Sequence, residues 1–289
     1  MGRNDRDHGA LPWRGRRRAT TLAPLTAILA VAPLVLLVLL PLPGLSAEDS
    51  TPQTSPESPD QTAGPPIEGL FDLYIGGLRA AEMTVTASFK EGRYKAAARI
   101  ATAGMIGGVF KASIDAAVEG RLIGEPFVTD RPWFEPERYR SESLNPRQDR
   151  RVAMDFLAGA PSVSAEPAYD PRPWELDPSS QEDSLDPISG IVAGLSPASR
   201  GTLCNREIVI FDARRRYAVR LDAPSTPNSD GEIICEAEYR RVAGFKPKLL
   251  KRPPFPFRTV FLERADGLWA FERAMGETPI GTAVLRRRR

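Results

Sequence analysis

Alternation of apolar and polar residues with a period of two is the feature that most constrains the fold of this chain. It is clearest from Leu78 to Phe89, where the apolar residues Met83, Val85, Ala87 and Phe89 alternate with Glu82, Thr84, Thr86 and Ser88. Because successive side chains of a strand point to opposite faces, this pattern predicts a half-buried β-strand.

Similar segments recur along the chain between turn signals. Gly76-Gly77 and Glu91-Gly92 predict tight turns on either side of the first long strand. Further strands are predicted at 70–75, 94–101, 111–123, 139–145, 151–157, 203–211, 217–221, 232–241, 258–263, 268–274 and 281–285. So many strands predict a mainly β fold: a strongly curved antiparallel sheet or an open half-barrel, with one short helix packed against it.

That helix begins at Asp186-Pro187. Asp186 is suited to accept the free N–H groups of a first turn, and Pro187 suits the first helical position. The predicted helix ends at about Leu195. Residues 103–110 predict a short helical turn or loop, and the proline-rich, acidic segment 161–187 predicts a loop.

Residues 1–47 predict export from the cytoplasm. A basic cluster at Arg14, Arg16, Arg17 and Arg18 precedes a stretch from Ala19 to Ala47 without any charged residue. A positive flank before an apolar run is typical of a signal peptide or a membrane anchor. Prolines interrupt the run, and both readings stay open. We therefore expect a periplasmic protein, either free or tethered to the inner membrane by residues 19–47.

The remaining chain predicts two further parts. Residues 48–67 are rich in Ser, Thr and Pro and predict a disordered linker, whereas residues 68–289 are long enough for a single β-rich domain with a basic C-terminal tail. The first 47 residues carry six Arg and two Asp, so without them the net charge changes from +2 to −2. This balance argues against nucleic acid binding. The tail Arg286–Arg289 is either solvated or a contact for anionic lipid.

The two cysteines, Cys204 and Cys235, predict a disulfide in an oxidising compartment. The bridge would close a loop of about 30 residues and stabilise the fold by a few kcal/mol. Two buried free thiols are the alternative. Neither a metal nor a cofactor is predicted, because the only histidine, His8, lies in the targeting segment.

No catalytic residue is assigned. Serine and cysteine hydrolases need a histidine base that the exported part lacks. A glycan hydrolase would instead need two carboxylates, and their spacing in the sequence points to no particular pair. The candidates are Glu119, Asp155, Asp212, Glu236 and Glu263.

Two segments are candidate binding sites. Met105, Ile106, Val109 and Phe110 either line a lipid-sized cavity or cap the core of the sheet. Asp212, Arg214 and Arg215 lie in a predicted hairpin loop, which is either a charged, solvated turn or a site for an anionic group.

Several segments occur in an order that resembles a known family. They are Leu73-Tyr74-Ile75-Gly76-Gly77-Leu78, Asp186-Pro187-Ile188-Ser189, Cys204-Asn205, the loop from Phe211 to Tyr217, and Cys235 followed by Tyr239 and Gly244-Phe245. Over residues 68–285 the chain resembles the exported proteobacterial family catalogued as domain of unknown function 3108. Ala213 departs from the glycine expected in that loop, and this departure predicts a different turn type.

The resemblance implies a periplasmic domain similar in architecture to the half-barrels of lipoprotein carriers, without any established activity. We therefore expect a non-enzymatic envelope module that binds a lipid, a lipoprotein or another amphipathic ligand. Two alternatives stay open: an envelope assembly protein without a ligand cavity, and a carboxylate-dependent glycan hydrolase.

Overall fold

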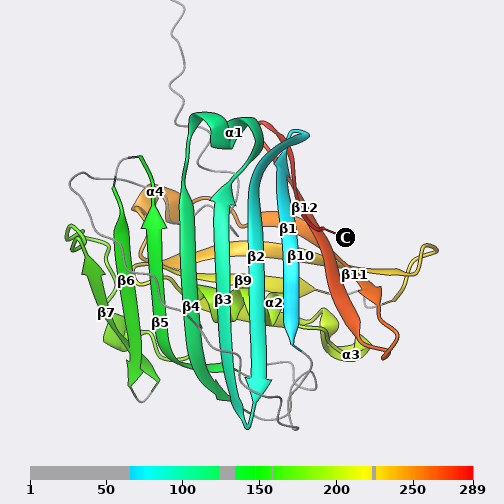
Figure 1. The fold of residues 1–289 in the computed structure, drawn as a ribbon, viewed down its shortest axis with the longest axis horizontal. Coiled ribbons are helices and arrows are strands. Elements are labelled where there is room, and N and C mark those ends of the chain that lie inside the picture. The colour runs from blue at the N-terminus through cyan, green and yellow to red at the C-terminus, as the bar shows by residue number, and fades with distance from the viewer. Residues whose placement is uncertain (1–65, 124–133, 147, 158, 223–225, 289) are drawn as a thin grey trace, which may run out of the picture.

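The computed structural model describes residues 66–123, 134–146, 148–157, 159–222 and 226–288. Within them, thirteen strands form one antiparallel sheet in the order β7-β6-β5-β4-β3-β2-β1-β13-β12-β11-β10-β9-β8. The prediction of a mainly β, curved antiparallel sheet is confirmed. The sheet bends over on itself without closing into a barrel (Figure 1). The targeting segment 1–47 and most of the linker 48–67 lie outside the described residues.

The first half of the sheet consists of β1 (Ile67–Ile75), β2 (Leu78–Lys90), β3 (Arg93–Thr102), β4 (Ser113–Leu122), β5 (Phe134–Leu144), β6 (Arg150–Leu157) and β7 (Ala160–Glu166). The second half consists of β8 (Arg206–Phe211), β9 (Arg216–Asp222), β10 (Glu232–Ala243), β11 (Phe255–Glu263), β12 (Trp269–Thr278) and β13 (Gly281–Arg287). The helices are α1 (Gly104–Val109), the 3₁₀ turn η2 (Pro178–Ser180), α2 (Pro187–Leu195), α3 (Arg200–Leu203) and α4 (Pro247–Leu250).

The chain starts and ends at the middle of the sheet. From β1 it meanders outward to the edge strand β7, passes through η2, α2 and α3 to the opposite edge strand β8, and then meanders back to β13, which pairs with β1. β7 and β8 are consecutive in sequence but lie at opposite edges, and the segment between them crosses on the concave side of the sheet. This crossing carries α2 into the interior.

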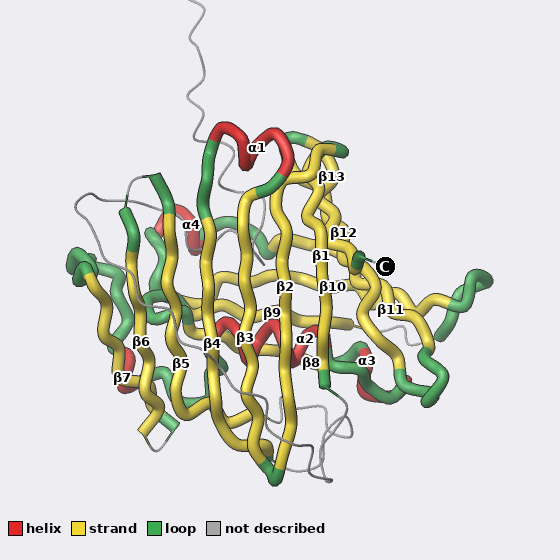
Figure 2. The backbone as a smooth tube through the Cα atoms, viewed as in Figure 1, coloured by secondary structure: helices red, strands yellow, loops and turns green. Residues whose placement is uncertain are grey.

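The two halves face each other with α2 between them. In Figure 2, β9 and β10 run behind β2–β4 and cross them at a steep angle, and α2 lies in the space between the layers. The inward residues of both halves and of α2 form one continuous core. Phe71, Phe261 and Val192 are examples from the two halves and the helix, and each is at most 2% exposed.

A buried polar chain holds α2 at its first turn. Asp186 caps the helix as predicted: its Oδ1 accepts hydrogen bonds from the N–H groups of Ile188 at 2.8 Å and Ser189 at 3.1 Å. The Ser189 hydroxyl donates to Asp186 Oδ2, and the hydroxyls of Tyr94 and Ser189 lie 2.7 Å apart. Tyr94 belongs to β3, so this chain ties the helix to the first half of the sheet.

The C-terminal arginines are bound to the sheet. Arg286 and Arg287 belong to β13, and Arg288 Nη2 lies 2.6 Å from Asp72 Oδ1 on β1. The hydrogen bond from Arg288 is the main cause that lowers the pKa of Asp72. These three residues therefore do not form a free tail, because partners on β1 hold them, although Arg286 and Arg288 are exposed to solvent. A contact with anionic lipid stays a prediction.

The structure differs from the sequence prediction at two further elements. The segment 161–187 was expected to be a loop, but it contributes most of β7, including Pro161. A proline is compatible with this position because β7 is an edge strand. Cys204 lies between α3 and β8 rather than inside a strand. None of the helices in the described residues has the length and apolar character needed to cross a membrane.

Candidate functional site

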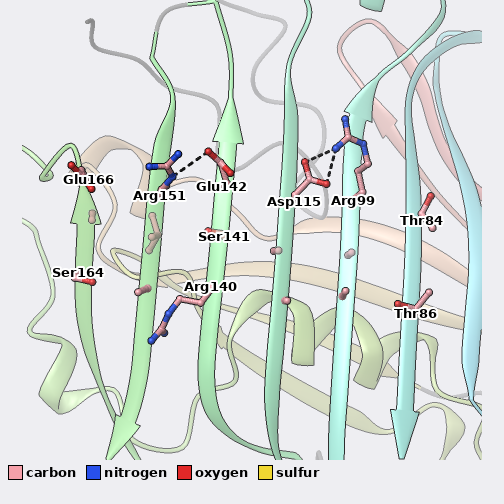
Figure 3. A pocket seen from close by; sticks show the side chains of 17 residues that line it. Thr84, Thr86, Arg99, Asp115, Arg140, Ser141, Glu142, Arg151, Ser164 and Glu166 are labelled. Atoms are coloured by element: carbon pink, nitrogen blue, oxygen red, sulfur yellow. Dashed lines mark hydrogen bonds and ion pairs between the residues drawn. The ribbon is translucent and has the colours of Figure 1, made fainter. Parts of the chain in front are cut away.

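The outer face of β2–β7 carries a groove of about 810 Å³ that runs across the strands (Figure 3). Its floor is a row of side chains that pair from strand to strand, most of them small. The row consists of Thr86, Ala97, Ala117, Arg140, Ala153 and Ser164. A second hollow of about 440 Å³ shares Thr86, Ala97, Ala117 and Arg140 with the first and extends toward Pro66.

Two rows of mostly charged residues form the walls of the groove. One wall consists of Thr84, Arg99, Asp115, Glu142, Arg151 and Glu166, and the other of Ser88, Lys95, Glu119, Arg138, Asp155 and Ser162. Arginines pair with carboxylates on neighbouring strands: Arg99 Nη1 lies 2.7 Å from Asp115 Oδ1, and Arg138 Nη1 lies 2.6 Å from Glu119 Oε1. These pairs hold the wall side chains in place and balance most of their charge.

Arg140 is the one large side chain of the floor row, and it leaves the floor open. Its guanidinium turns toward Asp155, with Nη2 at 2.8 Å from Oδ1. Nη1 donates to the carbonyl oxygen of Tyr139 at 2.8 Å, so the side chain lies along the sheet. Figure 3 shows Arg140 directed away from Glu142 and Arg151.

The strand register sets the size of the groove. The two walls are four residues apart along each strand, which corresponds to about 13 Å at 3.3 Å per residue. The floor crosses from β2 to β7, which is five strand spacings, or about 24 Å. This spacing between the Cα atoms of the two walls is comparable to the diameter of a single α-helix with side chains, about 10–12 Å.

The interior offers much less room. Between the two halves, a cavity of about 100 Å³ remains beside α2, lined mainly by apolar side chains such as Ile114, Ile191, Ile208 and Phe271. Sites for small ligands usually have volumes of roughly 300–1,000 Å³. The side chains of α2 fill most of the concave space in which a bound lipid was expected.

The predicted lipid-lining residues lie elsewhere. Met105, Ile106 and Val109 belong to α1, at one end of the sheet, and Phe110 follows them. None of these four residues lines the interior cavity. Met105 and Val109 are 70% and 92% exposed, whereas Ile106 packs against the core.

The predicted anionic-group loop is satisfied by its own contacts. Asp212 Oδ1 accepts hydrogen bonds from the backbone N–H groups of Arg214 at 3.2 Å and Arg215 at 2.8 Å. Asp212 Oδ2 lies 2.9 Å from Arg215 Nη2, and Arg214 Nη2 lies 2.8 Å from Glu175 Oε1. Binding of an anion here stays a prediction, and an incoming anion would have to compete with these carboxylates.

Ala213 takes the backbone conformation that a glycine would take, with φ at +74°. The prediction of a different turn type is therefore wrong. Left-handed backbone costs roughly 1–2 kcal/mol for a residue with a Cβ. We expect Ala213→Gly to raise the free energy of unfolding by about 0.5–1 kcal/mol. Glycine relieves the backbone strain, but its greater conformational entropy in the unfolded chain offsets part of this stabilisation. Urea unfolding followed by circular dichroism would measure this, and an unchanged midpoint would contradict it.

Most of the candidate carboxylates have arginine partners. Glu119, Asp155, Asp212 and Glu236 each pair with an arginine. The fifth, Glu263, is the last residue of β11 and is exposed. The described residues contain no cluster of three or more His, Cys, Asp or Glu side chains arranged to hold a metal ion.

The predicted disulfide is confirmed. Cys204 and Cys235 are bonded, with their Cα atoms 5.5 Å apart, and both are at most 1% exposed. The bridge joins the segment after α3 to β10. It therefore anchors the C-terminal end of the crossing that carries α2.

Comparisons with known proteins give little further information. No family model and no curated protein matches the chain. A solved structure, the beta-barrel-like protein of domain of unknown function DUF1849 from Brucella abortus, aligns with a TM-score of 0.39 and 11% identity over 78% of this chain and 96% of that one. The resemblance to domain of unknown function 3108 stays a prediction.

Proposed function

We propose that this chain is a non-enzymatic module of the bacterial envelope that holds a helical segment of a partner protein in its outer groove. One contrast carries the proposal: the concave side is filled by α2 down to about 100 Å³, whereas the outer face has an open groove of about 810 Å³. The export signal predicted in residues 1–47 supports the envelope as its place of action.

The contacts of α2 favour the groove over a lipid site in the interior. A lipid between the two halves would require α2 to leave, because an acyl chain does not fit beside it. Leaving would break the buried chain of hydrogen bonds between Asp186, Ser189 and Tyr94. It would also strain the crossing at Cys204, which the disulfide fixes to β10.

The floor and its length favour a helix as the occupant. The methyl groups of Ala97, Ala117 and Ala153 make the floor apolar, and their small size allows the backbone of a partner helix to approach the sheet closely. At 1.5 Å per residue, a floor of about 24 Å accommodates a helix of about 16 residues. A helix with small apolar residues on one face and charged residues on its flanks would fit the floor and both walls.

The unpaired charges give the helix a direction. Lys95 on β3 and Glu166 on β7 have no ion-pair partner among the described residues, and they lie toward opposite ends of the groove. Because a helix is positive at its N-terminus and negative at its C-terminus, the N-terminus would lie near Glu166 and the C-terminus near Lys95.

Photo-crosslinking in living cells would test the proposal. With a benzophenone amino acid in place of Ala117, we expect a discrete adduct to one protein, cross-linked within a helix of that protein. A second substitution, Ala97→Trp, fills the floor and should remove the adduct. Ala97 and Ala117 are exposed, so neither change disturbs the core.

The matched control is Ala265, an exposed alanine in the turn between β11 and β12. A benzophenone at Ala265 should give no such adduct, and Ala265→Trp should leave the Ala117 adduct intact. Equal adducts from both positions, or an adduct that survives Ala97→Trp, would exclude the groove as the binding surface. Saturable binding of a fluorescent fatty acid to the purified chain would instead favour a lipid ligand.

A further inference from the structure

Four exposed apolar side chains form a rim at one end of the sheet. They are Leu78 at the start of β2, Met105 and Val109 on α1, and Ile280 between β12 and β13. Their exposed fractions are 50%, 70%, 92% and 46%. We call this group the apolar rim, and Figure 2 shows its three connections at the same end of the molecule.

Backbone contacts place these three connections side by side. The N–H group of Gly76, in the turn before Leu78, donates to the carbonyl oxygen of Thr282 at 3.0 Å. On the other side, the N–H group of Ala103 donates to the carbonyl oxygen of Ala80 at 2.9 Å. The turn before β2 is therefore flanked by the β12–β13 turn and by α1, and the rim is continuous.

Local contacts fix α1 with its apolar side chains outward. Thr102 Oγ1 donates to the carbonyl oxygen of Phe110 at 2.8 Å and accepts from the N–H group of Ala112 at 3.0 Å. This clamp closes the base of the loop, and Ile106 packs against the core beneath it. The exposure of Met105 and Val109 is thus a consequence of a fixed backbone.

We infer that the apolar rim inserts into the interfacial layer of a lipid membrane. The rim projects from turns at the end of the sheet, and side chains that project can enter a soft lipid surface without a complementary hollow in a protein partner. Residues 76–80, 103–112 and 278–282 contain no acidic residue, and Lys111 adds an exposed positive charge beside α1. The exposed carboxylate at the edge of the rim, Glu277, accepts a hydrogen bond from the Thr282 hydroxyl at 2.9 Å. This combination fits a membrane with anionic head groups.

The inference is independent of the groove and has a geometric consequence for it. The floor residue Thr86 is eight positions after Leu78 along β2, which corresponds to about 26 Å. With the rim in the membrane, the strands would stand upright on the surface. The groove would then run parallel to the membrane plane, at that height above it.

An environment-sensitive fluorophore on the full-length chain would test the insertion. Both native cysteines are in the disulfide, so Met105→Cys provides a single thiol for labelling. In vesicles of phosphatidylethanolamine and phosphatidylglycerol, we expect a blue-shifted emission from the label and quenching by lipids that carry a nitroxide on the acyl chain. Leu157→Cys is the matched control, because Leu157 is 72% exposed and ends β6, outside the rim.

A second substitution makes the test specific. Val109→Glu should lower the inserted fraction of the label at position 105 roughly tenfold, as expected from losing one buried apolar side chain, whereas Leu157→Glu should leave it unchanged. A label at position 105 that stays water-exposed in vesicles would overturn the inference. A blue shift that depends on protein concentration without vesicles would also overturn it, and would show contact between copies of the chain.

Discussion

Replacing both cysteines is expected to lower the free energy of unfolding by about 3–4 kcal/mol. Cys204 and Cys235 are separated by 31 residues, and in the chain-entropy model a loop of this length gives a loss of this size. Alanine is the suitable replacement, because both sites are buried and neither needs a polar group. Urea unfolding of the Cys204→Ala/Cys235→Ala chain under non-reducing conditions measures the loss.

The wild-type chain with reductant is the control for this prediction. Reduction should move the unfolding midpoint close to that of the double variant, and the same reductant should leave the variant unchanged. A variant that unfolds at the wild-type midpoint would show that the bridge does not limit the unfolded chain.

Asp186 is expected to make the protein less stable as the pH rises from 4 to 7. Burial raises the pKa of this carboxyl from 3.8 to about 6, although the hydrogen bonds from Ser189 oppose the shift. The folded state then binds a proton more tightly than the unfolded state. The stability from this group is present below pH 4 and is lost as the pH rises through 6, by about 3 kcal/mol.

The variant Asp186→Asn isolates this effect. Its amide oxygen can still accept from the N–H groups of Ile188 and Ser189, so the helix cap is retained. We expect the difference in unfolding free energy between wild type and variant to change by about 2.4 kcal/mol between pH 4 and pH 7, in favour of the variant at high pH. The pKa of Asp72 is lowered, so its contribution to the stability of the protein is lost as the pH falls. This contribution is the same in wild type and variant, and it cancels in the difference between their unfolding free energies.

Chemical denaturation at several pH values provides the measurement. A difference that is flat across this range would mean that Asp186 ionises as an ordinary surface carboxylate. The hydrogen bonds from Ser189 and Ile188 would then balance the effect of burial on the pKa of Asp186.

Secondary-structure elements could be predicted from the sequence where a short segment carries a clear pattern, such as apolar–polar alternation or a helix start signal. The alternation from Leu78 to Phe89 matches β2, and the Asp186-Pro187 start signal matches α2. β7 was missed because prolines dominate its neighbourhood, and the position of a strand at the sheet edge is not visible in a sequence. The conformation of Ala213 is not visible in the sequence, because a turn held by Asp212 keeps a residue with a Cβ in left-handed backbone.

The groove could not be predicted because it depends on strand register. The sequence shows that Ala97, Ala117 and Ala153 occupy polar-face positions of three strands. It does not show that they fall in one row, since a shift of one strand by two residues would bring a charged wall residue into the floor. The filled interior also escaped prediction, because it follows from the long crossing between two edge strands that are neighbours in sequence.

The pairing of β1 with β13 decides when folding can be completed. A chain that emerges N-terminus first presents β1 and its neighbour β2 early. The other neighbour of β1 is β13, the last strand to appear. Until then, the two meanders can form only as separate hairpin arrays joined through the α2 segment. The final seven residues of the sheet, Gly281–Arg287, therefore act as the closing seam of the whole domain, and a nascent chain truncated before them would keep β1 and β12 as unprotected edges.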